Sequence, residues 1–160
     1  MQIIDAQTPA ELDQVRELFR EYHAYLKTEH GLELDYQGIQ AELDDLPGKY
    51  APPQGRLKLA VEDGRALGCV ALRPLEAGVC EMKRMYVPGE QRGRGIGRLL
   101  AEKLIEDARQ AGYRRMRLDT ALFLSSAVHL YESLGFRRIE PYGNVPEDIG
   151  EIAVFMELEL

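Results

Sequence analysis

Cysteine, histidine and long apolar runs are scarce in this chain, and tryptophan is absent. Its 160 residues include two cysteines and three histidines. Cys69 and Cys80 fall among apolar residues of expected strands, which favours reduced core thiols over a bridge between them. His23, His30 and His129 have no metal-ligand spacing with the cysteines, so we predict no metal site. We expect His23 and His30 at the surface or at helix edges, and His129 on another helix face than Tyr131. No apolar stretch approaches the length that spans a bilayer, which argues against a role in the membrane.

The charge of the chain limits its partners. The net charge of −7 argues against general nucleic-acid binding. Residues 1–56 contain eleven acidic and five basic side chains, whereas residues 92–117 contain eight basic and three acidic ones. The first part therefore suits cations and the second suits polyanions. The alternative is that these charges simply lie on solvated helix faces and have no binding role.

Length and composition indicate one globular domain. The chain is 45% hydrophobic and 29% charged, and it contains no repeat, low-complexity tract or interdomain linker. Met1–Asp5 shows no basic region followed by an apolar run, so we predict no secretory leader and expect a cytoplasmic location.

Apolar periodicity and turn residues predict a mixed α/β domain. Thr8-Pro9-Ala10-Glu11 is a capping box with proline at the first helical position, and Asp63-Gly64 is a hairpin turn. Strands are expected at 2–5, 57–61, 66–72, 79–87, 115–120, 137–139 and 152–158, and helices at 9–26, 37–45, 96–110 and 125–134. The third helix is expected to bury Ile96, Leu99, Leu100, Leu104 and Ala108. The unit from Val79 to Thr120 is expected to be a parallel crossover.

The most informative segment joins a strand to an amphipathic helix through alternating glycines and arginines. Its residues are Arg92, Gly93, Arg94, Gly95, Ile96, Gly97 and Arg98. The start of a helix exposes free backbone N–H groups at its positive end, which bind anions. Arginine side chains add charge-assisted donors for phosphate. The segment therefore predicts a site for a phosphorylated ligand.

Three kinds of phosphate loop compete for this segment. A P-loop needs Gly-Lys followed by Ser or Thr, and Gly97-Arg98-Leu99 fails this requirement. A nicotinamide-dependent enzyme needs a dinucleotide motif. Gly93 and Gly95 fit that motif and Asp119 lies where a ribose-binding acid is expected, but Arg98 stands where the third glycine belongs. The chain before residue 79 also lacks the strand–helix alternation of a doubly wound sheet.

The third interpretation rests on three motifs at matching spacing. Residues 92–97 resemble the R/Q-x-x-G-x-G/A signature of the GNAT superfamily, the acyl-CoA-dependent N-acyltransferases. Residues 81–87, Glu-Met-Lys-Arg-Met-Tyr-Val, resemble that family's fourth strand, and residues 130–136, Leu-Tyr-Glu-Ser-Leu-Gly-Phe, resemble its L-Y-x-x-x-G-F element. The resemblance implies a single N-acetyltransferase domain over 1–160. Its α/β fold would have a mixed, mostly antiparallel sheet of about seven strands, a central splayed parallel pair and helices on both faces.

The resemblance implies acetyl-CoA as cosubstrate and names residues that would bind it. The backbone of Met85, Tyr86 and Val87 would pair with the pantetheine arm, as an added strand does. The amides of residues 93–98 would hold the pyrophosphate with the neighbouring arginines beside it, and glycine lets the phosphate approach the backbone. Relatives are often dimers, so a homodimer is also expected.

One position departs from the family pattern. Many relatives carry Asn where this chain has Leu124, and that Asn bonds the pantetheine. Here Ser126 or Ser125 is the candidate replacement donor, and capping of the following helix is the alternative for both.

The chemistry requires an acid for the leaving thiolate, an oxyanion stabiliser and a neutral amine. By resemblance Tyr131 is the acid, because a phenol can protonate a thiolate, and a core tyrosine is the alternative. The N–H of Met85 or a neighbour would polarise the thioester carbonyl. Glu81 and Asp119 lie where different relatives carry a basic glutamate, and a proton relay through water is the alternative. Cys80 is a poor nucleophile candidate because no base is placed near it.

The acceptor is expected over the first two helices and beside the loop at 142–146. Acids and tyrosines gather there: Glu29, Glu33, Asp35, Glu42, Asp44, Asp45, Tyr22, Tyr25, Tyr36 and Tyr50. This composition favours a cationic small-molecule amine. A protein acceptor, either a lysine or an N-terminus, is one alternative. A non-catalytic acyl-CoA-binding module is another, against which Tyr131 and the two carboxylates argue.

Overall fold

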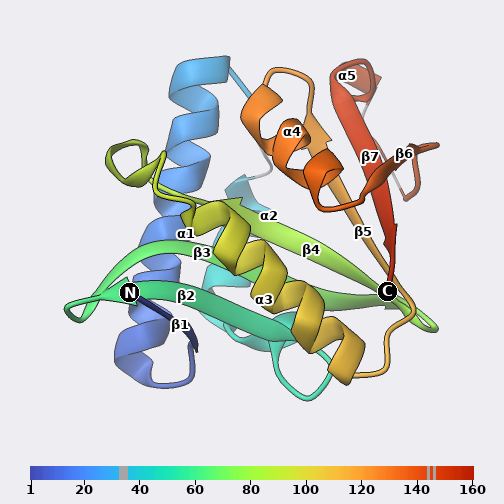
Figure 1. Ribbon diagram of the computed structural model, residues 1–160. Helices are drawn as coiled ribbons and strands as arrows, with labels where there is room; N and C mark the ends of the chain where they lie inside the picture. The colour runs from blue at the N-terminus through green and yellow to red at the C-terminus, as the bar shows by residue number, and fades with distance from the viewer. Residues whose placement is uncertain (33–35, 144, 146) are drawn as a thin grey trace.

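The computed structural model describes residues 1–32, 36–143, 145 and 147–160, and contains one sheet with helices on both faces (Figure 1). The strands are β1 (Gln2–Asp5), β2 (Arg56–Glu62), β3 (Arg65–Glu76), β4 (Val79–Tyr86), β5 (Arg115–Ala121), β6 (Arg137–Ile139) and β7 (Ala153–Glu159). The helices are α1 (Pro9–His30), α2 (Tyr36–Asp45), α3 (Ile96–Gln110), α4 (Ser125–Ser133) and the short α5 (Glu147–Gly150), with 3-10 turns η1 (Gly48–Tyr50) and η2 (Gly89–Gln91). The predicted order of strands and helices is confirmed, and α5 and the two 3-10 turns are additions to it.

The strands follow the order β1-β2-β3-β4-β5-β7-β6 across the sheet. All neighbouring pairs are antiparallel except β4 and β5, which are parallel as the crossover predicts. Their pairing covers only Val79–Glu81 against Arg115–Arg117. Beyond these residues the two strands diverge (Figure 1), which confirms the expected splayed pair. A single parallel pair in an antiparallel sheet is not a doubly wound dinucleotide fold.

Helix α3 covers one face of the sheet, and α1 and α2 cover the other (Figure 1). Leu100 of α3 is fully buried between this helix and the sheet. Gly68 lets this helix approach β3, because a Cβ there would lie 3.1 Å from the Tyr86 carbonyl oxygen and 3.2 Å from the Ile96 side chain. The prediction that Leu99 is buried is wrong, since it is 41% exposed. It points away from the sheet, one position before the buried leucine.

The helix starts differ in how well the sequence predicts them. The capping box of α1 is present, with the Thr8 hydroxyl accepting from the Glu11 N–H at 3.2 Å and the Glu11 carboxylate accepting from the Thr8 N–H at 3.0 Å. At α4 the cap is Leu124, which makes no side-chain cap bond. The prediction that Ser125 or Ser126 caps α4 is therefore wrong, because both serines already lie in its first turn.

The two cysteines are buried and free, as predicted for core thiols. Burial raises the pKa of the Cys69 thiol and of the Cys80 thiol to about 12, so neither is a thiolate near neutral pH. Across the described ranges no three His, Cys, Asp or Glu side chains group as metal ligands. None of the helices in those ranges combines the length and the apolarity needed to cross a bilayer.

Candidate active site

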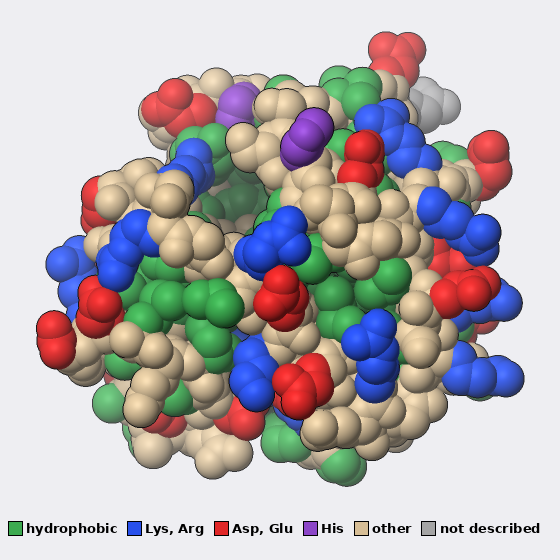
Figure 2. Space-filling model, viewed as in Figure 1, with side chains coloured by type: hydrophobic (Ala, Val, Ile, Leu, Met, Phe, Trp, Pro, Cys, Tyr) green, Lys and Arg blue, Asp and Glu red, His purple; other side chains and the backbone are tan. Residues whose placement is uncertain are grey.

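A cleft of about 1240 Å³ opens where β4 and β5 diverge. Its walls come from α1, the second half of β4, the loop before α3, β5 and α4. Figure 2 shows a hollow between α1 and α4, with apolar side chains inside and basic side chains at the rim. Tyr131, Glu81 and Asp119 all line the cleft, as do residues 85–87. The structure thus brings the candidate catalytic side chains and the candidate pantetheine edge into one cavity.

Strand β4 carries one extra residue opposite β3. Between the facing pairs Cys69–Tyr86 and Ala71–Lys83, β3 advances by two residues and β4 by three. The extra residue produces a bulge at Arg84, whose φ of +58° lies in the left-handed region that non-glycine residues rarely adopt. Bulges redirect side chains and often lie next to active sites.

The edge of β4 that faces β5 is open after Glu81. Strand β3 occupies the other edge, and no strand in the described ranges pairs with this edge beyond Glu81. Met85, Tyr86 and Val87 lie at this edge and line the cleft. Unpaired N–H and C=O groups along an edge can bind an extended ligand as an added strand.

The loop between β4 and α3 presents six consecutive backbone N–H groups that make no protein hydrogen bond. Among the residues described, the amides of 93–98 have no acceptor, and the first bonded amide is that of Leu99, which donates to the Gly95 carbonyl at 3.1 Å. Gly93 and Gly95 have φ of +84° and +78°, and a Cβ on either would meet nothing within 4 Å. Unbonded amides at the start of a helix form an anion site.

The arginines of this loop contact protein groups around it. The Arg92 guanidinium lies 4.7 Å from the centre of the Tyr25 ring in α1. Arg94 donates to the Glu62 carboxylate of β2 at 3.1 Å. Arg98 donates to a serine hydroxyl of α4 at 2.5 Å. These side chains hold the loop against α1, β2 and α4, and the backbone amides are its open donors.

Tyr131 lies on α4 and lines the cleft. Its ring is almost fully buried and packs edge-on against Phe136 at 5.8 Å between ring centres. No hydrogen-bond partner of its hydroxyl exists within the described part of the chain. Burial raises the pKa of the Tyr131 phenol, and neighbouring Tyr22 and Asp119 raise it further. The phenol is therefore protonated at neutral pH.

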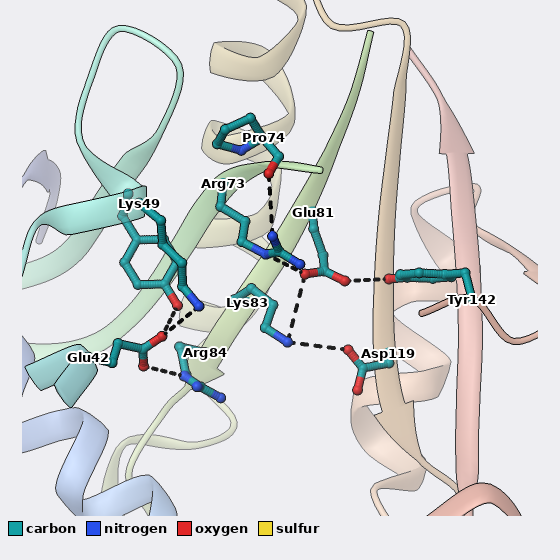
Figure 3. A network of polar contacts seen from close by, with 10 residues as sticks. Glu42, Lys49, Arg73, Pro74, Glu81, Lys83, Arg84, Asp119 and Tyr142 are labelled. Carbon is teal, nitrogen blue, oxygen red and sulfur yellow. Dashed lines mark hydrogen bonds and ion pairs between the residues drawn. The ribbon is translucent and has the colours of Figure 1, made fainter. Parts of the chain in front are cut away.

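Glu81, a candidate base, is held on both carboxylate oxygens. Arg73 Nε donates to Oε1 at 2.8 Å, and the Tyr142 hydroxyl donates to Oε2 at 2.7 Å (Figure 3). Lys83 Nζ lies 3.8 Å from Oε1, and Glu81 is only 3% exposed. Burial, followed by the Glu81 charge, raises the pKa of Tyr142, so this hydroxyl stays a donor. The arrangement favours Glu81 as an anchor for the segment after β6 rather than as a base.

Asp119, the other candidate base, has an open carboxylate. It lies on β5 two residues beyond the end of the pairing with β4, and its side chain is 44% exposed. Lys83 Nζ approaches its Oδ1 to 3.6 Å across the start of the split (Figure 3). A carboxylate in this position can accept a proton directly or through water.

Glu42 of α2 is fully engaged by protein partners. It accepts from Arg84 Nε at 2.9 Å and from the Tyr50 hydroxyl at 2.5 Å, and Lys49 Nζ lies 3.1 Å away (Figure 3). Burial would raise the pKa of the Glu42 carboxyl, but the Arg84 charge and these hydrogen bonds lower it to about 2. Glu42 therefore holds Arg84 in place and is not available to an acceptor.

Replacing Glu42 by Gln is expected to flatten the acid dependence of stability. Because the folded pKa of this carboxyl, about 2, lies below its ordinary value of 4.5, the carboxylate stabilises the fold above pH 4.5. That contribution, at most roughly 3 kcal/mol, is lost as the pH falls from 4.5 to 2. Urea unfolding at pH 7 and pH 3 measures it, with Glu106→Gln on the exposed side of α3 as control. An equal loss of stability in wild type and Glu42→Gln would contradict the assignment.

The remaining acids do not support a cationic acceptor. Asp44 accepts from Gln40 at 3.0 Å, and neither it nor Glu29 or Asp45 lines the described wall. Glu33, Asp35 and the side chain of Tyr36 lie outside the described residues, as do Asn144 and Pro146 of the second candidate wall. The charged side chains of the described wall are Arg73, Glu81, Lys83, Arg84, Arg92, Arg98 and Asp119. Cations outnumber carboxylates in this wall.

Aromatic rings connect α1 to the opposite wall. Tyr22 and Tyr25 lie 5.3 and 6.1 Å from the Tyr86 ring, and His30 stacks on Phe123 at 4.1 Å. These contacts join α1 to β4 and to the segment before α4. The cleft therefore combines basic side chains with aromatic surfaces.

His23 of α1 is half-buried, as predicted for a helix-edge residue. Both of its ring nitrogens are buried and have no partner among the described residues. Burial lowers the pKa of His23, and the nearby Arg84 charge lowers it further, to about 4. The ring is therefore neutral at physiological pH.

Ser125 and Ser126 lie exposed at the start of α4 and line the cleft. In the described structure the amides of residues 125–127 have no backbone acceptor, and the first bonded amide is that of Val128, to the Leu124 carbonyl. Since neither serine is the cap, the hydroxyl of Ser126, two positions after Leu124, is available as a donor to a ligand in the cleft.

The sequence interpretation missed Lys83 and Arg84 as site residues. Regular alternation along β4 would place them on opposite faces, whereas the extra residue of the bulge lets both side chains line the cleft. The signal was the spacing of the apolar side chains: Met82 and Met85, three positions apart, both pack against the core under α3. A strand without a bulge would repeat every two residues.

Comparisons with known proteins agree with this geometry. The profile of the acetyltransferase (GNAT) family matches residues 12–136. An uncharacterized N-acetyltransferase of Schizosaccharomyces pombe is 42% identical over 154 residues, which cover 95% of this chain and 90% of that protein. A GCN5-related N-acetyltransferase of Kribbella flavida superposes with a TM-score of 0.73 at 28% identity, covering 99% of this chain and 97% of the other. A structure from Salmonella typhimurium, solved with its cofactor acetyl-CoA, has the same fold at 20% identity, with a TM-score of 0.74 over 99% and 92% of the two chains.

Proposed function

Because the chain belongs to the acetyltransferase (GNAT) family, we propose that it moves the acetyl group of acetyl-CoA to a primary amine by direct attack in a ternary complex. Family membership makes it an N-acetyltransferase. The proposal adds that the acceptor is a primary amine and that the amine attacks acetyl-CoA directly. The observation that carries it is the cleft itself, where six open amides, an open strand edge and the Tyr131 hydroxyl line one cavity. We propose that residues 1–160 form one such domain.

The donor fits three parts of the described cleft. The amides of residues 93–98 would hold the pyrophosphate, since Gly93 and Gly95 leave the space before them open. The open edge at residues 85–87 would pair with the pantetheine arm, and the Ser126 hydroxyl would bond to it from α4. Acetyl-CoA supplies the thioester carbon that the amine attacks. The Salmonella structure, solved with its cofactor acetyl-CoA on the same fold, supports acetyl-CoA as the donor.

The residues of the cleft supply the remaining chemistry. An amine nitrogen forms a bond to the thioester carbon, the C–S bond breaks, and the Tyr131 hydroxyl donates its proton to the leaving sulfur. The N–H of Met85, at the open edge beside the bulge, would stabilise the oxyanion. Asp119 would take the proton lost by the amine, directly or through water, because its carboxylate is open whereas that of Glu81 is not.

The alternatives differ in their acceptor or in the absence of one. Of the acidic residues that suggested a cationic amine, the described ones, Glu29, Glu42, Asp44 and Asp45, lie off the described wall and so do not support that acceptor. A protein lysine or N-terminus would need the cleft to admit a chain segment. A cytoplasmic location and a homodimer stay predictions, which cell fractionation and sedimentation would check.

The function is tested by incubating the protein with acetyl-CoA and a panel of amines. We expect free thiol to form only when an accepted amine is present, together with the N-acetylated product detected by mass spectrometry. Amino acids, polyamines and peptides represent the acceptor classes. Tight binding of CoA without thiol release from any member would instead indicate a non-catalytic acyl-CoA-binding module.

A further inference from the structure

Resting on this proposed acetyl transfer, we propose that the acceptor is an amino acid whose carboxylate is bound by Lys83 and Arg84. The acceptor would be a primary amine with a carboxylate within a few bonds of the reacting nitrogen. The inference follows from the position of these two cations, from their unused hydrogen-bond donors and from the charge balance of the wall around them.

Lys83 and Arg84 are consecutive residues of β4 at the bulge, on the side of the cleft where the acceptor would enter. Figure 3 shows Lys83 extending toward Asp119 and Arg84 extending toward Glu42 of α2. Both side chains line the cleft. The left-handed φ of Arg84 is unfavourable for this residue type, and such strain concentrates at functional sites. A regular strand would have turned Arg84 into the core under α3 instead.

Both cations keep donors that no protein group uses. Lys83 Nζ lies 3.8 Å from Glu81 and 3.6 Å from Asp119, and within the described residues it makes no hydrogen bond. Arg84 uses Nε for Glu42, while its terminal NH₂ groups have no described partner. The two side chains are 22% and 18% exposed, so these donors reach the cleft. An ammonium and a guanidinium with free N–H groups are the donors that carboxylates prefer.

The surrounding charges leave one positive charge in excess. The cluster contains the cations Arg73, Lys83, Arg84 and Lys49 and the carboxylates Glu42, Glu81 and Asp119. Two of these carboxylates, Glu81 and Glu42, accept short hydrogen bonds from Arg73 and Arg84. The neutral His23 ring, which cannot add a positive charge, adjoins the same group. One added carboxylate would balance the cluster, whereas a polyamine would be repelled.

The position of Lys83 fixes how far the carboxylate lies from the amine. Lys83 contacts Asp119 across the start of the β4–β5 split, beside the open edge where the acetyl group would arrive. An amine near Asp119 then has its carboxylate at Lys83 and Arg84 only if a few bonds separate the two groups. Amino acids meet this condition, and a peptide N-terminus does not, because its first carboxyl group is an amide.

The test compares amino acids with their own carboxamides as acceptors. Each pair shares its amine and side chain and differs only in the carboxylate. We expect wild type to use an accepted acid at least about 10-fold better in kcat/KM than its amide. Lys83→Met should raise KM for the acid about 10-fold to 100-fold, leave KM for acetyl-CoA unchanged and lower the amide's kcat/KM much less than that of the acid. Lys83→Arg should keep the preference for the acid, and Lys103→Met on the exposed side of α3 is the matched control.

The outcomes separate this inference from the proposed function. If Lys83→Met lowers acid and amide equally, Lys83 acts through Asp119 rather than on a carboxylate, and the inference is overturned. Equal use of acids and amides by wild type overturns it as well. If no amine causes thiol release, the proposed transfer fails. The carboxylate site is then tested by the binding of amino acids alone. In that case amino acids, but not their amides, should raise the melting temperature of the CoA-bound wild type and not of Lys83→Met, and equal shifts would overturn the site.

Discussion

Replacing Tyr131 by Phe is expected to lower kcat by about 100-fold or more, because the leaving thiolate loses its proton donor. The affinity for CoA should stay nearly unchanged, since the proposed binding groups are the loop amides and the edge of β4. Stability should also change little, because the hydroxyl has no described hydrogen-bond partner whose loss would carry a cost. Steady-state kinetics, CoA titration and thermal melting measure the three quantities separately.

Tyr113→Phe provides the matched control for this substitution. The Tyr113 hydroxyl donates to the Gln54 carbonyl at 2.7 Å, away from the cleft wall. Removing this hydroxyl should lower the stability of the protein and leave kcat near the wild-type value. Unchanged turnover in Tyr131→Phe would remove this residue from the acid role and return it to the status of a core aromatic. A fall in both kcat and CoA affinity would indicate a disturbed cleft instead.

The backbone arrangement could be predicted because local sequence signals and global fold agree. The capping box before α1, the hairpin turn after β2 and the glycines before α3 each specify a local conformation that the structure keeps. The splay of β4 and β5 could be expected only by resemblance, because no periodicity distinguishes a strand that pairs along its length from one that separates.

Side-chain partners could not be predicted in the same way. Glu81 and Tyr142 are 61 positions apart, and nothing local indicates that the hydroxyl would occupy the carboxylate expected to be a base. The acidic first part of the chain suggested a cationic acceptor, yet Glu42 pairs with Arg84, 42 positions away. A count of charges in a segment cannot show which of them the tertiary structure has already neutralised.

Replacing Gly93 and Gly95 together by Ala is expected to raise the dissociation constant of CoA by about 10-fold to 100-fold, from weakened charge-assisted hydrogen bonds. Each added Cβ would enter the open space that the amides of residues 93–98 face, and would hold the pyrophosphate away from them. Isothermal titration with CoA, and with a pantetheine fragment that lacks the pyrophosphate, measures the effect. The fragment should bind the variant as it binds wild type.

Gly64→Ala separates loss of the phosphate site from backbone strain. Gly64 has a φ of +75°, and a Cβ there would meet nothing within 4 Å, as at the two loop glycines, but it lies in the turn between β2 and β3. All three positions carry the left-handed penalty of about 1–2 kcal/mol for an L-residue. Because the penalty is shared, Gly64→Ala should lose a similar stability per site while its affinity for CoA stays that of wild type. If Gly64→Ala weakened CoA binding as much as the loop variant, strain rather than the loss of approach to the amides would explain the effect, and the pyrophosphate would have to be held elsewhere.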